Sequence, residues 1–187
     1  SEGDAGIYDA INKGITKSSG DVVGLLHADD VFENNSVVGN VMRLFDENID
    51  MIYGDINYVD RKDINRVIRR WKSDSYSKGK FKYGWMPPHT GFFIKKSCYT
   101  KYGLYNLSLG SSADYELMLR MFEVYNLKSK YIPLNITKMR VGGISNSSFK
   151  NRWEANRNDK KSWKINGLKP FWFTFLIKPI IKIKQFF

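Results

Sequence analysis

Two adjacent carboxylates, Asp29 and Asp30, follow directly on the apolar run DVVGLLHA of residues 21–28. The run is continuous and of strand length, which is typical of a strand buried on both faces of a parallel sheet. Adjacent acids repel one another and are costly to bury, so the pair needs either open solvent or a cation. Ligands of α/β sheets bind beyond the carboxyl ends of the strands, where the pair would hold Mg²⁺ or Mn²⁺ against substrate phosphates. The alternative is a solvated turn in which Asp30 caps the following helix.

The chain around this pair alternates helical and strand patterns, which predicts an α/β fold with a mixed, mainly parallel sheet flanked by helices. Asp4 is placed to cap the first helix and Gly20 to end it. Residues 75–89 mix Gly, Pro, Lys and aromatics without a period, which indicates a loop. Helices are expected over 6–18, 35–48, 96–103, 112–126 and 148–166, and strands over 21–28, 50–60, 66–74, 90–96 and, as a closing pair, 128–141.

The composition limits the classes of protein. At 187 residues and 42% hydrophobic, the chain can bury one core, and its net charge of +11 favours an anionic partner such as a nucleotide, a nucleic acid or a membrane surface. The basic residues are dispersed over the domain and become concentrated only in the tail, and they form no known nucleic-acid-binding motif. This argues against nucleic acid as the partner. Cys98 is the single cysteine, so an intramolecular disulfide and a thiolate zinc cage are excluded and a reducing, cytoplasmic setting is expected.

The last segment, residues 167–187, differs in character from the domain expected over 1–166. Aromatics and Ile alternate with Lys, no acid appears, and Pro170 and Pro179 limit the segment to short helices. Its longest uncharged stretch, 170–177, is far below the roughly 20 residues of a spanning helix. Two interpretations stay open. The tail lies on an anionic membrane surface at the inner face of the plasma membrane, or it packs on the domain or on a partner, since Lys178 and Lys182 interrupt its apolar face.

The stretch SEGDAGIYDAINKGITKSSGDVVGLLHADD, residues 1–30, resembles family-2 inverting glycosyltransferases of the GT-A fold, especially bacterial enzymes of cell-surface polysaccharide synthesis. Members typically read S-E-x-D-x-G-I-Y-D-A-x-N-x-G, followed by an apolar strand that ends in a DXD-like acidic motif. The resemblance continues through PPHTGFFIKK, SADYELMLRMF and RVGGISNSS and covers residues 1–163. His27 stands where relatives often have Asp or Asn; it contacts the donor or packs at the strand end.

The resemblance implies a role for each matching residue. Asp30, helped by Asp29, would hold Mn²⁺ or Mg²⁺ against the diphosphate of the donor. Asp114, in the first turn of a helix, would be the general base that deprotonates the acceptor hydroxyl, with Glu116 as the second candidate. Donor contacts are implied for Asp4, Gly6, Lys13, Asp29 and Arg140, and acceptor contacts for His89 and Trp85, although Trp85 is equally consistent with a core or loop anchor.

The function that these residues predict is metal-dependent, inverting transfer of a sugar from a nucleotide-diphospho-sugar to a glycan or lipid-linked acceptor. Family members begin with a strand, a helix and a second strand that hold the nucleotide, and none of these precedes Ser1. The chain opens inside a motif, without an initiator Met or a signal-peptide pattern. We therefore expect residues 1–166 to be a partial GT-A domain. The alternative is a truncated, non-catalytic remnant that binds carbohydrate or membrane.

Overall fold

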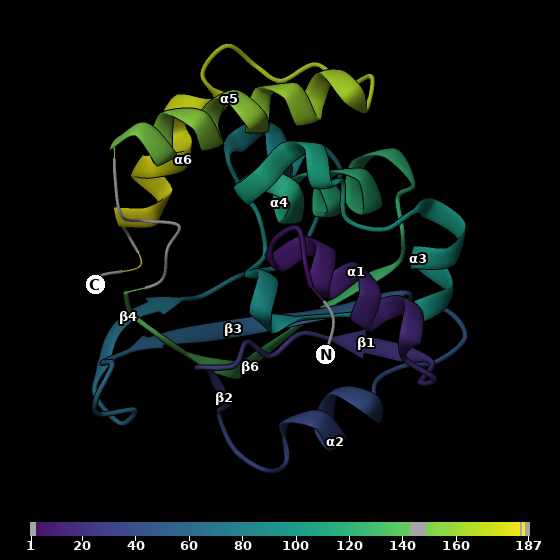
Figure 1. The fold of residues 1–187 in the computed structure, drawn as a ribbon, viewed down its shortest axis with the longest axis vertical. Helices are drawn as coiled ribbons and strands as arrows, with labels where there is room; N and C mark the ends of the chain where they lie inside the picture. Colours follow the sequence, from purple (N-terminus) through teal and green to yellow (C-terminus); the bar gives the residue numbers. More distant parts are fainter. Residues whose placement is uncertain (1–2, 143–148, 184, 186–187) are drawn as a thin grey trace.

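The computed structural model describes residues 3–142, 149–183 and 185 of the chain. Within them, six strands form one sheet with helices on both faces (Figure 1). The strand order is β1-β5-β3-β6-β2, and β4 also pairs with β3. The strands are β1 (Val22–Gly24), β2 (Val31–Phe32), β3 (Met51–Val59), β4 (Val67–Trp71), β5 (Phe92–Lys95) and β6 (Ser129–Arg140). The predicted α/β architecture of a GT-A fold is confirmed.

The sheet is mixed, as predicted, but most of its described strand pairs are antiparallel and not parallel. Strands β3 and β6 run parallel, whereas the β1–β5, β2–β6, β3–β4 and β3–β5 pairs are antiparallel. Strand β1 is shorter and less buried than expected, because in the described sheet it lies at an edge and pairs with β5 alone. Residues 128–141 form the single strand β6 instead of a pair, since β6 pairs with β3 over most of its length.

Six α-helices are described: α1 (Ile7–Lys17), α2 (Val37–Met42), α3 (Lys96–Tyr102), α4 (Ala113–Leu119), α5 (Phe149–Ile165) and α6 (Thr174–Ile183). Helix α2 is shorter than the predicted 35–48. Asp4 does not cap α1, because the N-cap position is Gly6 and makes no side-chain hydrogen bond. A π-helical turn, Arg120–Val124, extends α4, and short 3₁₀ turns cover Lys80–Tyr83, His89–Gly91 and Leu107–Ser112. Among the described helices, none is both long and apolar enough to cross a membrane.

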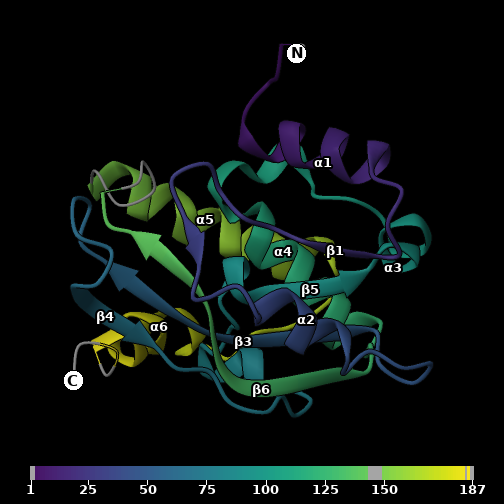
Figure 2. The same ribbon diagram turned by 90° about the horizontal axis from the view of Figure 1, so that it is seen from below.

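The side chains of β3 alternate between two apolar clusters on opposite faces of the sheet. Ile52 packs with Val37 and Val41 of α2, which covers one face alone (Figure 2). Met51 and Tyr53 belong to the larger cluster on the other face, where α1 and α4 lie and α5 covers α4 from outside (Figure 1).

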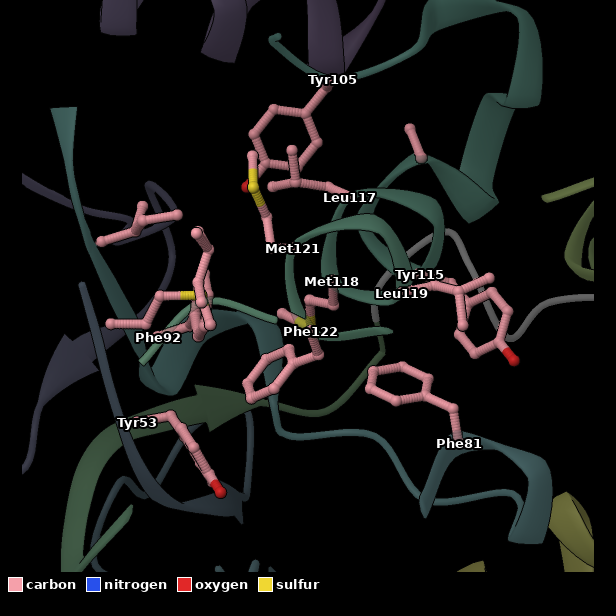
Figure 3. Packing of buried hydrophobic residues seen from close by; sticks show 14 of the residues in the cluster. Tyr53, Phe81, Phe92, Tyr105, Tyr115, Leu117, Met118, Leu119, Met121 and Phe122 are labelled. Atoms are coloured by element: carbon pink, nitrogen blue, oxygen red, sulfur yellow. The ribbon is translucent and has the colours of Figure 1, made fainter. Parts of the chain in front are cut away.

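The larger cluster forms around α4, whose apolar side chains point toward the sheet and the 3₁₀ turn at 80–83 (Figure 3). Its helical periodicity is the one that the sequence predicts. This packing fixes the orientation of α4 and therefore the direction of its first turn, which carries Asp114. The α4 segment contributes Leu117, Met118, Leu119, Met121 and Phe122, and they meet Tyr53, Phe81, Phe92, Tyr105 and Tyr115.

Gly54 lies against the backbone of β6, where a Cβ atom would lie 2.6 Å from the carbonyl oxygen of Leu134. A strand would have to move to admit it. We expect Gly54→Ala to lower the free energy of unfolding by about 1–3 kcal/mol, the usual cost of overpacking, in urea denaturation. Gly14→Ala in α1 is the matched control, because nothing lies within 4 Å of that Cβ position. Wild-type stability of Gly54→Ala would contradict the close approach.

Candidate active site

The acid pair lies in a turn between β1 and β2. The backbone N–H of Asp30 donates to the carbonyl oxygen of His27 at 3.0 Å and closes the turn. This turn leaves Asp29 exposed and directs Asp30 inward, where 7% of its surface is exposed. The two neighbouring carboxylates thus occupy different environments.

Arg140, the last residue of β6, contacts both members of the pair. Its backbone N–H donates to Asp30 Oδ1 at 3.0 Å, and its guanidinium donates to the carbonyl oxygen of Asp29. Burial raises the pKa of Asp30, while the hydrogen bond from Arg140 opposes this rise. A cation placed beside Asp30 would favour its ionised form. The structure therefore brings together three residues to which the sequence assigns donor or metal contacts.

Strand topology explains why Tyr58 lies close to this turn. Strands β3 and β6 are parallel, with Tyr58 opposite Met139, so their carboxyl ends meet at one edge of the sheet. Burial raises the pKa of the Tyr58 phenol, and the charges of Asp114 and Asp30 raise it further. The guanidinium of Arg69, 4.1 Å from the centre of the ring, opposes them. Both carboxylates therefore lie within electrostatic reach of the same phenol.

Asp114 occupies the first turn of α4, where its carboxylate accepts from the backbone N–H of Tyr115 at 2.7 Å. The helix dipole favours a negative charge at this end. The phenol of Tyr8, from α1, lies beside it: burial raises the pKa of Tyr8, and the charge of Asp114 and a hydrogen bond to its carboxylate add to the rise. Asp114 is half-buried, so part of its surface remains accessible.

His89 joins the same group. Its Nε2 lies 3.2 Å from the hydroxyl of Tyr105, and its ring centroid lies 5.8 Å from that of His27. Burial lowers the pKa of His89 and His27 lowers it further, whereas Asp114 raises it. The net lowering keeps His89 neutral at neutral pH, so its ring offers one donor and one acceptor.

Tyr105 is held in place through its backbone. Asn12 of α1 donates from Nδ2 to the carbonyl oxygen of Tyr105 at 2.9 Å and accepts the Tyr105 N–H at 3.0 Å. The Tyr105 ring stacks on that of Tyr8, with centroids 5.3 Å apart. Helix α1 is thereby fixed beside the group of Asp114 and His89.

Other predicted residues lie outside this group. Trp85 is 9% exposed, packs against Tyr53, Phe81 and Phe122, and donates to Asp74 at 2.6 Å. The structure thus gives Trp85 a packing role, one of the two interpretations that the sequence left open, and not the acceptor contact implied by the resemblance.

Two of the residues to which the resemblance assigns donor contacts, Asp4 and Lys13, form an ion pair with each other at the start of α1. The ammonium of Lys13 lies 3.1 Å from Asp4 and 2.9 Å from Asp9, on an exposed face. Gly6 adopts a φ of 127°, a conformation that favours glycine, with nothing within 4 Å of its Cβ position. Lys13 would have to leave these acids to contact a diphosphate.

Glu116, the second candidate for the base, is separated from Asp114 by burial. It is 2% exposed, its carboxylate pairs with Arg120 at 2.8 Å, and Asn166 donates to it at 3.0 Å. Arg120 in turn donates to the carbonyl oxygens of residues 102–104. These contacts fix a structural role for Glu116 and leave Asp114 as the accessible acid of α4.

The model of the glycosyl transferase family 2 domain matches residues 1–105, more than half of the chain. The chain belongs to this family. The matched region includes the acid pair and His89 and ends before Asp114 and Arg140, whose roles therefore depend on geometry and on the resemblance of their local motifs.

Two relatives show how much of a glycosyltransferase this family-2 chain represents. An uncharacterized glycosyltransferase of Mycobacterium tuberculosis (strain CDC 1551 / Oshkosh) is 34% identical over 130 residues, 64% of this chain and 45% of that protein. A PGL/p-HBAD biosynthesis glycosyltransferase of Mycobacterium bovis (strain BCG / Pasteur 1173P2) is 26% identical over 148 residues, 77% of this chain and 55% of that protein. The chain spans about half the length of these curated relatives.

The donor set fits a hard divalent cation that shares its coordination with a ligand. In the described part of this family-2 chain, no three His, Cys, Asp or Glu side chains form a cage for a metal. Mg²⁺ is commonly held by one or two carboxylates together with substrate phosphates. Asp30 and Asp29 supply such oxygen donors, and no soft ligand accompanies them.

Sequence reasoning did not find Tyr58, Tyr105 or Arg69. For Tyr58, a signal was available, because it stands near the end of a predicted strand, where ligand-binding residues are expected. Tyr105 and Arg69 carry no motif, and only the folded chain brings them to the site.

The structure also contains an open cavity of about 520 Å³ at the amino end of β1, lined in part by Asp21, Glu47 and Lys96. The acid pair follows the carboxyl end of β1, so this cavity lies at the other end of the strand. Because ligands of α/β sheets bind at carboxyl ends, the geometry favours the acid pair over the cavity as the site.

Proposed function

We propose that the protein transfers a sugar from a nucleotide-diphospho-sugar to a glycan or lipid-linked acceptor, with inversion and with a divalent metal. The observation that supports this proposal is the common neighbourhood of Asp30 and Asp114. The turn that carries Asp30 also carries His27, whose ring lies 5.8 Å from that of His89, and Asp114 lies within electrostatic reach of His89 and of Tyr58. One acid would serve the leaving diphosphate and the other the incoming alcohol. A binding-only remnant would not need a carboxylate at both places.

In this mechanism, Asp114 accepts the proton of the acceptor hydroxyl as the oxygen attacks the anomeric carbon. The new bond forms on the face of the anomeric carbon opposite the nucleotide diphosphate, and the electron pair of the broken bond between that carbon and the diphosphate oxygen leaves with the diphosphate. Attack from that face inverts the configuration. Asp30 and Asp29 are the residues that would hold the metal, and Arg140 would contact the diphosphate. When bound, a divalent cation would offset the charge that develops on the leaving group.

Neutral His89 would orient the acceptor beside Asp114, because its ring offers hydrogen bonds without a competing charge, and the hydroxyl of the buried Tyr105 would hold that ring in place. Trp85 has no part in this step. The organised polar side chains come from different segments of the chain, and the packing of α4 and α1 holds them together.

The test is transfer or donor hydrolysis by the purified chain over a panel of nucleotide-diphospho-sugars with Mn²⁺. We expect activity with one donor class, loss of activity in EDTA, recovery with Mn²⁺ or Mg²⁺, and a rate at least about 100-fold lower in Asp30→Asn. Asp21→Asn, at the other end of β1, is the matched control and should keep the rate. No reaction across the panel from a folded chain would favour the carbohydrate-binding remnant, and loss of rate in Asp21→Asn alone would move the site to the cavity.

A further inference from the structure

The outward face of α6 and of the turn before it is apolar. Trp172, Leu176 and Ile180 are 84%, 62% and 58% exposed. Leu176 and Ile180 are four residues apart and therefore lie on one side of the helix, and Trp172 lies in the turn before it. Helix α6 lies at the edge of the molecule, beside α5 (Figure 1).

The inward face of the same helix holds both apolar and polar side chains. The hydroxyl of Thr174 donates to the carbonyl oxygen of Lys82 at 2.6 Å, and Phe175 packs in the larger apolar cluster. Lys178 turns inward, where its ammonium lies 2.5 Å from Asp159 and 3.6 Å from the centre of the Tyr115 ring. A surface helix in water normally keeps its apolar residues toward the protein, so the apolar residues on the outward face of α6 are in excess of those that the domain buries.

Lys178 interrupts the apolar pattern in the sequence, and the structure removes that interruption by pairing it with Asp159. The exposed face is then extended by Phe171 and Tyr83, whose ring centroids lie 5.6 Å apart. We call Tyr83, Phe171, Trp172, Leu176 and Ile180 the apolar stripe. All five side chains are at least 39% exposed.

The exposed charges that border the apolar stripe in the sequence are basic. Residues 160–187 contain seven lysines and no acid. The side chains of Lys164 and Lys169 are exposed, and the ammonium of Lys82 lies 5.3 Å from the Phe171 ring. An apolar surface with a basic border matches an anionic lipid surface, where Trp prefers the interface and lysines meet the headgroups.

We propose that the apolar stripe docks on the surface of an anionic lipid bilayer, with Trp172, Leu176 and Ile180 inserted among the headgroups and the lysines above them. This inference is independent of the proposed transfer reaction. A second copy of the chain is a poorer occupant, because two basic borders would repel each other.

Vesicle co-sedimentation of the full chain tests the proposal. We expect the chain to bind vesicles of phosphatidylcholine that contain roughly 30–40% phosphatidylglycerol, and to bind vesicles of phosphatidylcholine alone only weakly. Binding to the anionic vesicles should decrease as the salt concentration is raised. The triple variant Trp172→Ala/Leu176→Ser/Ile180→Ser should lose about tenfold or more in partitioning. Lys169→Glu should lose several-fold on anionic vesicles alone. Deleting the tail is a poorer test, because Phe175 and Lys178 pack on the domain.

Leu107→Ser is the matched control, since Leu107 is 48% exposed on the 3₁₀ turn at 107–112 and lies outside the stripe. It should bind vesicles as the wild type does, and circular dichroism should show that every variant is folded. Equal vesicle binding by the wild type and the folded triple variant would overturn the proposal. So would a wild-type dimer in size-exclusion chromatography that the triple variant converts to a monomer without any change in vesicle binding.

Discussion

Asp114→Asn is expected to lower the rate of sugar transfer by about 10²–10⁴, the contribution of a general base. The amide is nearly the same size as the carboxylate and still accepts hydrogen bonds from Tyr8 and the Tyr115 N–H, so the fold should be kept. It has no pair of electrons basic enough to take the acceptor proton. Initial rates of product formation at saturating donor, with the free energy of unfolding measured alongside, check this prediction.

The control distinguishes loss of the base from a general disturbance of the site. Donor binding, measured by calorimetry, should change little in Asp114→Asn, because Asp30 and Arg140 are untouched. A variant that turned over at the wild-type rate would show that another group accepts the proton, and His89 would be the first to examine.

Glu116→Ala is expected to lower the free energy of unfolding by about 3–5 kcal/mol, the usual result of removing one partner of a buried ion pair. Arg120 would keep its charge in a buried position, and the amide of Asn166 would lose its acceptor. Urea denaturation followed by far-UV circular dichroism measures this loss. The effect is on stability, in contrast to that of Asp114→Asn, although the two acids are two residues apart.

Glu154→Ala provides the comparison for this variant. Glu154 is an exposed acid of α5, and its removal should change stability by less than about 0.5 kcal/mol. Wild-type stability of Glu116→Ala would mean that the contacts of Arg120 and Asn166 contribute little, and would return Glu116 to the candidates for the base.

The sequence predicted most reliably what local periodicity controls. The β3 strand and the apolar face of α4 were foreseen because alternation and helical spacing are properties of neighbouring residues. Strand direction was not foreseen, because β5 and β6 reach β3 from distant parts of the chain, and an apolar run reads alike in both directions. The same reason explains why the full burial predicted for β1 is not seen, because the burial of a strand depends on which strands lie beside it.

At the site, the sequence identified charged residues in motifs and missed the groups that fold beside them. Tyr58 and Arg69 belong to a hairpin whose pairing places Arg69 over the Tyr58 ring, within electrostatic reach of Asp30 and Asp114. Trp85 could be assigned only from its burial, since a ring that stacks on sugar and one that packs in a core look the same in a sequence.

The two hydrogen bonds between the side-chain amide of Asn12 and the backbone of Tyr105 separate the placement of α1 from the choice of side chain at position 105. They use the main chain at position 105, so the placement of α1 depends on the amide at position 12 and not on the ring of Tyr105. That ring is 3% exposed and packs in the larger apolar cluster, so Tyr105→Phe would keep the packing and the register between helix and loop and would remove only the hydroxyl beside His89. In laboratory evolution, position 105 can therefore lose its polar tip, whereas position 12 cannot lose its amide.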